Sequence, residues 1–239
     1  WKLIFLKRVY LTLVPIVALF VFVISFNAGG SIVTDVVESG DADVPIAIDL
    51  SEIARVNVNP DNAKGIYLTM WSASNSKKME NIFALIDKTE INSVVIDVKG
   101  SQGELIYEYW SGIGDLIKKL HEKNIYAIAR VVVFQDSGYA MSNPEVALKN
   151  RSGGLWRDRR GFAWLDPAAK GSHDHIIDIA KKSIDLGFDE IQYDYIRFPT
   201  DGALSSIVYP AWDGQKSRNE VLREFFEYSK NKLKEYDPS

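Results

Sequence analysis

The sequence contains no cysteine, and this absence removes several kinds of chemistry at once. Disulfide bonds, thiolate metal sites and cysteine nucleophiles are all excluded. Basic residues are also in the minority, with 28 Lys and Arg against 32 Asp and Glu. Because binding to a nucleic-acid backbone requires a basic surface, the net charge of −4 argues against a nucleic-acid partner.

Histidine is scarce as well, and the three that occur fall at helical positions: His121, His173 and His175. A spacing of two residues on a helix does not direct both rings at one ion. We therefore expect surface histidines, no metal centre and no cofactor.

Charged residues are missing from residues 9–26, and Lys2, Lys7 and Arg8 precede that run. The length is at the lower edge of the about 17–25 residues that a membrane-spanning helix needs. The basic flank predicts that the N-terminus stays inside and that the rest is exported. We expect residues 1–30 to be a transmembrane signal anchor that holds the protein in the cell membrane. A cleaved signal peptide is the alternative, and the protein would then be secreted.

A regular pattern follows an acidic linker, residues 31–61. Strand-like runs alternate with amphipathic helical segments, and this alternation predicts a parallel sheet with right-handed crossovers. The predicted strands cover residues 65–71, 93–100, 125–134 and 190–198. The last predicted helix opens with a capping box formed by Ser217 and Glu220.

Two α/β architectures fit this pattern: a doubly wound sheet and a (β/α)₈ TIM barrel. The turn after the first strand, "TMWSASNS", lacks the glycine-rich phosphate loop typical of the doubly wound fold. A barrel of eight units needs about 250 residues. We therefore expect residues 62–239 to form only the first four units of a barrel, preceded by the transmembrane helix.

The stretch "GFDEIQYDYIRFP" places charges in a strand that should be buried. A dry, unpaired carboxylate costs several kcal/mol, so a polar strand end indicates either an ion pair or a site. Ligands bind at strand ends in both architectures. Period-two alternation places Asp97 and Lys99 on one face, and Gln192 and Asp194 on one face. The other polar residues near strand ends include Arg130, Asp136 and Arg197, whereas Asp189 and Glu190 are expected at the opposite end.

Five tryptophans lie in segments that follow strands. An aromatic ring can stack on the apolar face of a sugar, although packing beneath long loops would also place Trp there. The two interpretations are evenly balanced for the set. The candidates for sugar platforms are Trp71, Trp156 and Trp164.

Six ordered motifs resemble the putative glycosyl hydrolase domain family from about residue 64 to the end of the chain. They are "GIYLT", "VVIDVKG", "YAIARVVVF", "NPEVALKN…GGLWRD", "AWLDP" and "GFDEIQYDYIRFP". The resemblance implies a glycosidase-like (β/α)₈ barrel on exported proteins. Gly100 stands where the family often has an acidic residue, and related glycosidases commonly take a second carboxylate from a later strand.

The resemblance implies roles for the polar residues. The family's strand aspartates fall on Asp97 and Asp194, and its strand arginine falls on Arg130. Asp194 is the expected nucleophile or charge stabiliser, kept ionised by Arg130 or Arg197. Asp97 is a substitute acid or a ligand for sugar hydroxyls. The residues expected to contact a polysaccharide or oligosaccharide are Trp71, Lys99, Asp136, Trp156, Trp164 and Gln192. The alternative is a non-catalytic carbohydrate-binding or scaffold protein on the same barrel.

Overall fold

The structure is a computed structural model that describes residues 33–34, 46–47 and 62–237. The predicted membrane segment 1–30 lies outside these residues, as does most of the predicted linker. Within the described part of the chain, no helix has the length and apolar character needed to cross a bilayer. Residues 33–34 and 46–47 form two short antiparallel strands, β1 (Val33–Thr34) and β2 (Ile46–Ala47).

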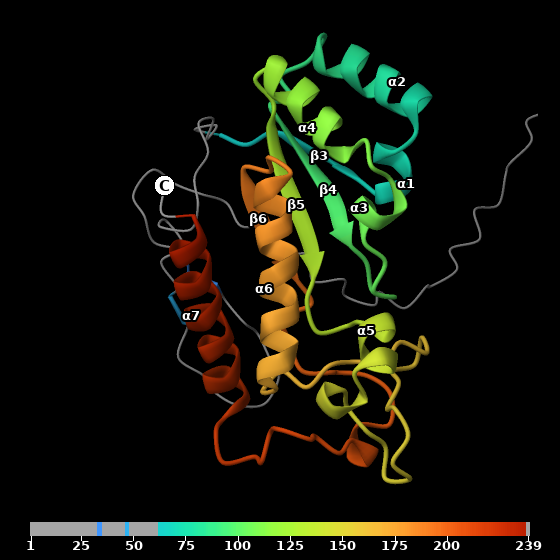
Figure 1. The fold of residues 1–239 in the computed structure, drawn as a ribbon, viewed down its shortest axis with the longest axis vertical. Coiled ribbons are helices and arrows are strands. Elements are labelled where there is room, and N and C mark those ends of the chain that lie inside the picture. Colours follow the sequence, from blue (N-terminus) through green and yellow to red (C-terminus); the bar gives the residue numbers. More distant parts are fainter. Residues whose placement is uncertain (1–32, 35–45, 48–61, 238–239) are drawn as a thin grey trace, which may run out of the picture.

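Four parallel strands form the centre of the fold, in the order β3-β4-β5-β6 (Figure 1). The spatial order equals the chain order, as in consecutive units of a barrel wall. The mixed α/β class with a parallel sheet is therefore confirmed. The strands are β3 (Gly65–Leu68), β4 (Ser93–Lys99), β5 (Tyr126–Val132) and β6 (Glu190–Asp194).

Helices connect each strand to the next, and α6 packs along β5 and β6 with α7 beside it (Figure 1). The capping box predicted for the last helix is present, because Ser217 and Glu220 exchange both hydrogen bonds. The helices are α1 (Met70–Ala73), α2 (Ser76–Ile86), α3 (Ile106–Tyr109), α4 (Ile113–Glu122), α5 (Ser137–Ser142), α6 (Lys170–Asp185) and α7 (Arg218–Tyr236). Two short 3₁₀ turns, η1 (Pro144–Val146) and η2 (Leu204–Ser206), lie in the connections.

Two strands are shorter than the sequence predicts, because local backbone features end them early. β3 stops at Leu68 because the Thr69 hydroxyl accepts a hydrogen bond from the Ser72 N–H at 3.2 Å and so caps α1. β6 stops at Asp194 because Tyr195 adopts a left-handed backbone with φ of 56°. The polar residues at these positions therefore lie where the chain leaves the sheet.

The two faces of the sheet differ in chemistry because side chains alternate along each strand. One face is fully apolar and buried. Its central positions are Val94, Ile96, Val98, Ala127, Ala129 and Val131. The opposite face carries Asp97 on β4, Arg130 on β5 and Gln192 on β6, which are direct neighbours in register. This second face is the one that a closed barrel would turn inward.

Glu190 lies on this polar face, at the end of β6 opposite Asp194, as the sequence predicts. It is the first residue of β6 and pairs with Ile128 in register. Burial raises the pKa of Glu190 to about 7, against the opposing effect of a hydrogen bond with Tyr126. Its neighbour Asp189 is buried and structural, because its Oδ2 accepts from the Ala127 N–H at 2.7 Å.

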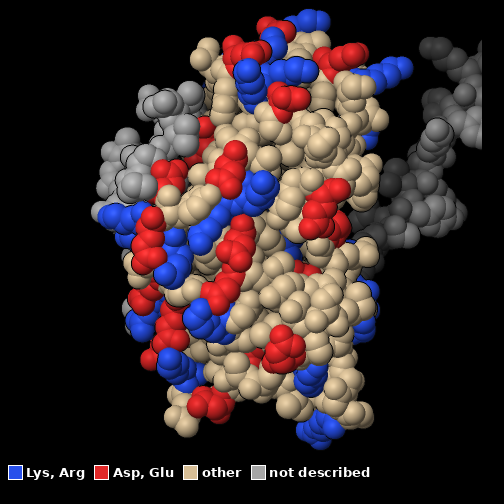
Figure 2. All heavy atoms as spheres, in the orientation of Figure 1, with Lys and Arg blue, Asp and Glu red and all other residues tan. Residues whose placement is uncertain are grey.

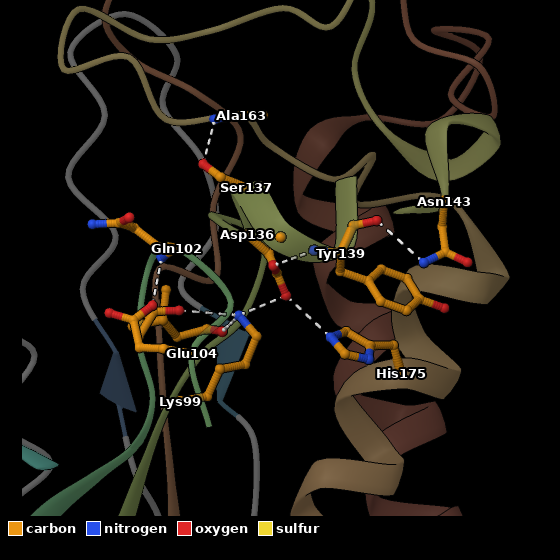
Figure 3. Close-up of polar contacts among 12 residues, drawn as sticks. Lys99, Gln102, Glu104, Asp136, Ser137, Tyr139, Asn143, Ala163 and His175 are labelled. Carbon is orange, nitrogen blue, oxygen red and sulfur yellow. Dashed lines mark hydrogen bonds and ion pairs between the residues drawn. The ribbon is translucent and has the colours of Figure 1, made fainter. Parts of the chain in front are cut away.

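A buried ion network fastens the loops that follow β4 and β5 (Figure 3). Lys99 Nζ lies 2.9 Å from Asp136 Oδ2, and neither side chain has any exposed surface. The same Nζ donates to the Val132 carbonyl at 2.7 Å. Asp136 Oδ2 also lies 3.0 Å from His175 Nε2 on α6, while Asp136 Oδ1 accepts the Tyr139 N–H at 2.8 Å and caps α5. Lys99 and Asp136 are therefore structural here, which corrects their expected role as substrate ligands.

Charges on the surface are interspersed. Figure 2 shows Lys and Arg alternating with Asp and Glu over the face formed by α6 and α7, without a continuous patch of one sign. A mixed face of this kind does not offer the basic surface that binds a nucleic-acid backbone.

Removing the charge of Asp136 tests the buried network. Asn caps a helix as well as Asp does, so Asp136→Asn retains the cap and removes the charged partner that lies in direct contact with buried Lys99. We expect a loss of about 3–5 kcal/mol in the free energy of unfolding, measured by urea denaturation. Asp87→Asn, which breaks an exposed pair with Lys123, is the control and should cost less than about 1 kcal/mol. Lys99→Met combined with Asp136→Asn should recover stability; no recovery would contradict the assigned cause.

Glu190 predicts an unusual dependence of stability on pH. Its pKa is raised in the folded chain from 4.5 to about 7, so the folded state prefers the neutral carboxyl. That preference stabilises the fold fully below the unfolded pKa and is lost as the pH rises through about 7. Glu190→Gln cannot ionise and should be more stable than the parent by up to about 3 kcal/mol at high pH.

Denaturant melts of both proteins across the neutral range would measure this difference. Glu227→Gln on α7, whose side chain is 66% exposed, is the control and should show no such pH trend. A constant difference between Glu190→Gln and the parent at every pH would contradict the assignment.

Candidate functional site

Four side chains on four successive strands form one connected row. Arg130 on β5 is central: its Nη1 donates to Asp97 Oδ1 on β4 at 2.6 Å, and its Nε donates to Asp194 Oδ2 on β6 at 3.0 Å. Its Nη2 also contacts Asp194 Oδ2. Tyr67 on β3 completes the row, because its hydroxyl donates to Asp97 Oδ2. The expected convergence of Asp97, Arg130 and Asp194 on one site is thus present in the structure.

Electrostatics fix the charge state of this row. Burial alone would lower the pKa of Arg130, but attraction to Asp194 and then to Asp97 outweighs it and raises the pKa. Partial burial and the hydrogen bond to Asp97 raise the pKa of Tyr67 to about 12. Arg130 is therefore a permanent cation, and Tyr67 is a neutral donor at physiological pH.

Asp194 is the carboxylate of the row that solvent reaches most. Its side chain is 31% exposed, compared with 12% for Asp97. Its second oxygen, Oδ1, accepts the Tyr195 N–H at 2.7 Å. Tyr195 itself has a positive φ of 56°, and a bulky residue in that region costs of order 1–3 kcal/mol. Strain of this kind concentrates at functional sites.

Arg197 does not contact Asp194, so Arg130 is the partner of the two that were expected. Arg197 Nη1 donates to Thr200 Oγ1 at 2.8 Å. Its guanidinium lies over the rings of Trp164 and Tyr195, at 5.0 and 5.4 Å from their centroids. Arg197 therefore packs beneath the loop that follows Asp194.

The three candidate tryptophan platforms separate into two groups. Trp156 and Trp164 are 2% and 1% exposed, and their indole N–H groups donate to the Ala203 carbonyl and to Asp158 Oδ2. A sugar platform requires an open ring face, so both are packing residues here, which corrects the expectation. Trp71 is 54% exposed and retains an open ring.

Histidine was expected on the surface, and this is wrong for His173. Its ring is buried, with Nε2 2.6 Å from the Pro167 carbonyl. His175 and His121 each pair with a buried aspartate. Within the part of the chain that the structure describes, no group of three or more His, Asp or Glu could hold a metal ion.

Sequence reasoning missed three residues of this region. Tyr67 alternates with Thr69 in the predicted strand 65–71, and this period-two spacing was a usable signal. Tyr109 lies on a helix too short to show a pattern, and no signal in the sequence indicated its exposure. The left-handed backbone of Tyr195 was also unpredictable, because Tyr rarely adopts it.

The chain matches known proteins over the same region. The family model described as a putative glycosyl hydrolase domain matches residues 65–238, which confirms the resemblance found in the motifs. A hypothetical protein from Ruminiclostridium thermocellum has a crystal structure with 34% sequence identity and a TM-score of 0.62. That match covers 70% of this chain and 91% of the other. No curated protein matches the chain.

Two enzymes share the fold at low identity. A GH31 alpha-xylosidase from a soil metagenome is 16% identical with a TM-score of 0.55, over 77% of this chain and 29% of the enzyme. A GH36 alpha-galactosidase from Geobacillus stearothermophilus is 15% identical with a TM-score of 0.51, over 74% of this chain and 27% of the enzyme. The chain thus spans less than a third of either enzyme, and these similarities establish the fold alone. On its match over residues 65–238, the chain belongs to the putative glycosyl hydrolase domain family.

Proposed function

We propose that this chain is a glycoside hydrolase domain that acts on an extracellular or cell-envelope polysaccharide, with Asp194 in the chemical step. One observation carries the proposal. A partly exposed carboxylate ends a barrel-type strand, and it accepts hydrogen bonds from both Arg130 and the Tyr195 N–H.

An ionised carboxylate suits the demand of glycoside cleavage. The transition state resembles an oxocarbenium ion, which a carboxylate stabilises by charge or captures as a nucleophile. Asp194 serves this role, because Arg130 holds its inner side in place while its exposed side remains open to a sugar.

Asp97 has a supporting role in this scheme. Both of its oxygens accept hydrogen bonds, one from Arg130 and the other from Tyr67. Because donors of the row occupy both of its oxygens, Asp97 orients Arg130. We propose that the general acid comes from a carboxyl group outside this row.

The wider setting of the domain also belongs to the proposal. We propose that the four parallel strands are part of a (β/α)₈ barrel whose polar face forms the cleft. The uncharged run at residues 9–26 and its basic flank support an exported, membrane-anchored protein. A non-catalytic carbohydrate-binding protein on the same barrel is the competing function.

Sugar release by the full-length protein tests the catalytic role of Asp194. Asp194→Asn keeps the shape of the side chain and removes its charge. We expect release of reducing sugar from envelope polysaccharides to fall about a thousandfold or more, because the reacting carboxylate is lost. Binding of the same polysaccharide, measured by affinity electrophoresis, should persist.

Asp178→Asn on α6, whose side chain is 78% exposed, is the matched control and should release sugar at the parent rate. Release that survives Asp194→Asn would remove Asp194 from the chemistry. Binding without release in the parent protein would favour the carbohydrate-binding function instead.

A further inference from the structure

Two large aromatic side chains stand exposed beside each other at the carboxyl edge of the sheet. Trp71 on α1 is 54% exposed, and Tyr109 on α3 is 56% exposed. Their ring centroids lie 4.4 Å apart, with an edge-to-face angle of 73°. The two helices are neighbours near the end of β4 in Figure 1.

Their exposure follows from how the short helices are anchored. Met70 and Ala73 of α1 are 3% and 1% exposed, and Ile106 of α3 is fully buried. These residues attach the inner side of each helix to the core. Trp71 and Tyr109 therefore project outward from fixed backbone, and each ring forgoes most of the stabilisation that burial would provide.

This aromatic pair adjoins the charged row. Trp71 lies four residues after Tyr67, whose hydroxyl donates to Asp97 and whose ring lies 5.7 Å from the Arg130 guanidinium carbon. Tyr67 is itself 53% exposed. Tyr67 thus presents exposed aromatic surface on the strand that leads directly into α1.

Distance separates the pair from the proposed reacting carboxylate. Asp194 lies on β6 and Tyr67 lies on β3, three strand spacings away, which is about 14 Å. The aromatic pair lies on the β3 side of this span, since α1 follows β3 directly. One monosaccharide cannot contact both ends.

We propose that Trp71 and Tyr109 form a distal sugar-binding site, so that the cleft recognises a chain of several sugar residues. This inference rests on the proposed function. An edge-to-face pair makes a corner of two ring faces, onto which the C–H face of a sugar packs while its hydroxyls remain in water. The substrate is accordingly a chain of several sugar residues, held at one end by the aromatic pair and presented to Asp194 at the other.

Binding as a function of chain length tests the site. Disaccharide and long-oligosaccharide fractions would be prepared by partial hydrolysis of a panel of envelope polysaccharides. Their affinities would be measured calorimetrically with the full-length Asp194→Asn protein, which does not consume them. The long fraction should bind more tightly, and Trp71→Ala or Tyr109→Ala should each reduce the ratio of long to short affinity roughly tenfold.

Two further variants separate stacking from structural damage. Trp71→Phe keeps an aromatic face and should retain most of the ratio. Tyr236→Ala removes an aromatic residue that is 43% exposed at the end of α7, and it should leave the ratio unchanged. An unchanged ratio in Trp71→Ala and Tyr109→Ala would overturn the inference, as would equal losses for both fractions.

The affinity ratios and the sugar-release assay together distinguish a failure of this inference from a failure of the proposed function. Sugar release that needs Asp194, together with a ratio insensitive to both aromatic variants, would leave the hydrolase intact and remove the distal site. A ratio that depends on both rings, in a protein that releases no sugar, would establish the distal site and remove the hydrolase. If none of the fractions bound to the protein, the distal site would be overturned.

Discussion

The bridge that Arg130 makes between Asp97 and Asp194 is the interaction on which the polar face of the sheet depends. Two carboxylates on strands either side of β5 would repel each other in a poorly hydrated cleft. The guanidinium is planar and always charged, and its donors satisfy both carboxylates at once, which a lysine ammonium could not do with the same geometry. The parallel register makes this possible, because it sets Asp97 directly opposite Arg130.

The opposite face of the sheet stabilises the fold and so offsets the cost of holding charged groups on the polar face. Its valine, isoleucine and alanine side chains on β4 and β5 are fully buried. Burial of apolar surface contributes roughly 25 cal/mol per Å², so a continuous apolar face offsets the desolvation of a few charged groups on the other. The buried Lys99–Asp136 pair stabilises a different part of the structure. It joins the loops that follow β4 and β5 to α6, and it thereby fixes the edge of the sheet where the strands end.

The sequence predicted the parts of this structure that follow from periodicity. Alternation of strands and helices gave the parallel sheet, and the polar residues near successive strand ends identified Asp97, Arg130 and Asp194 as candidates. The same logic failed for Lys99, because the register shifts between Asp97 and Lys99 and redirects the lysine to Asp136. The prediction that Trp156 and Trp164 are sugar platforms failed for another reason. They lie in the long connection between β5 and α6, whose isolated bridges bury both rings by contacts that no local pattern encodes.

The hydrogen bonds of Asp97 and Asp194 differ, and this difference supports different roles for the two carboxylates. Asp97 has both oxygens engaged by side chains of the row, and its exposure is low, so it serves as the counter-charge that orients Arg130. Asp194 receives one of its bonds from a strained backbone N–H and keeps nearly a third of its side chain exposed. A carboxylate held by donors on its inner side, and open on its outer side, has the geometry that the role proposed for Asp194 requires. The stabilisation of an oxocarbenium-like centre needs a fixed carboxylate that a ligand can reach, and Asp194 meets this need better than the more buried Asp97.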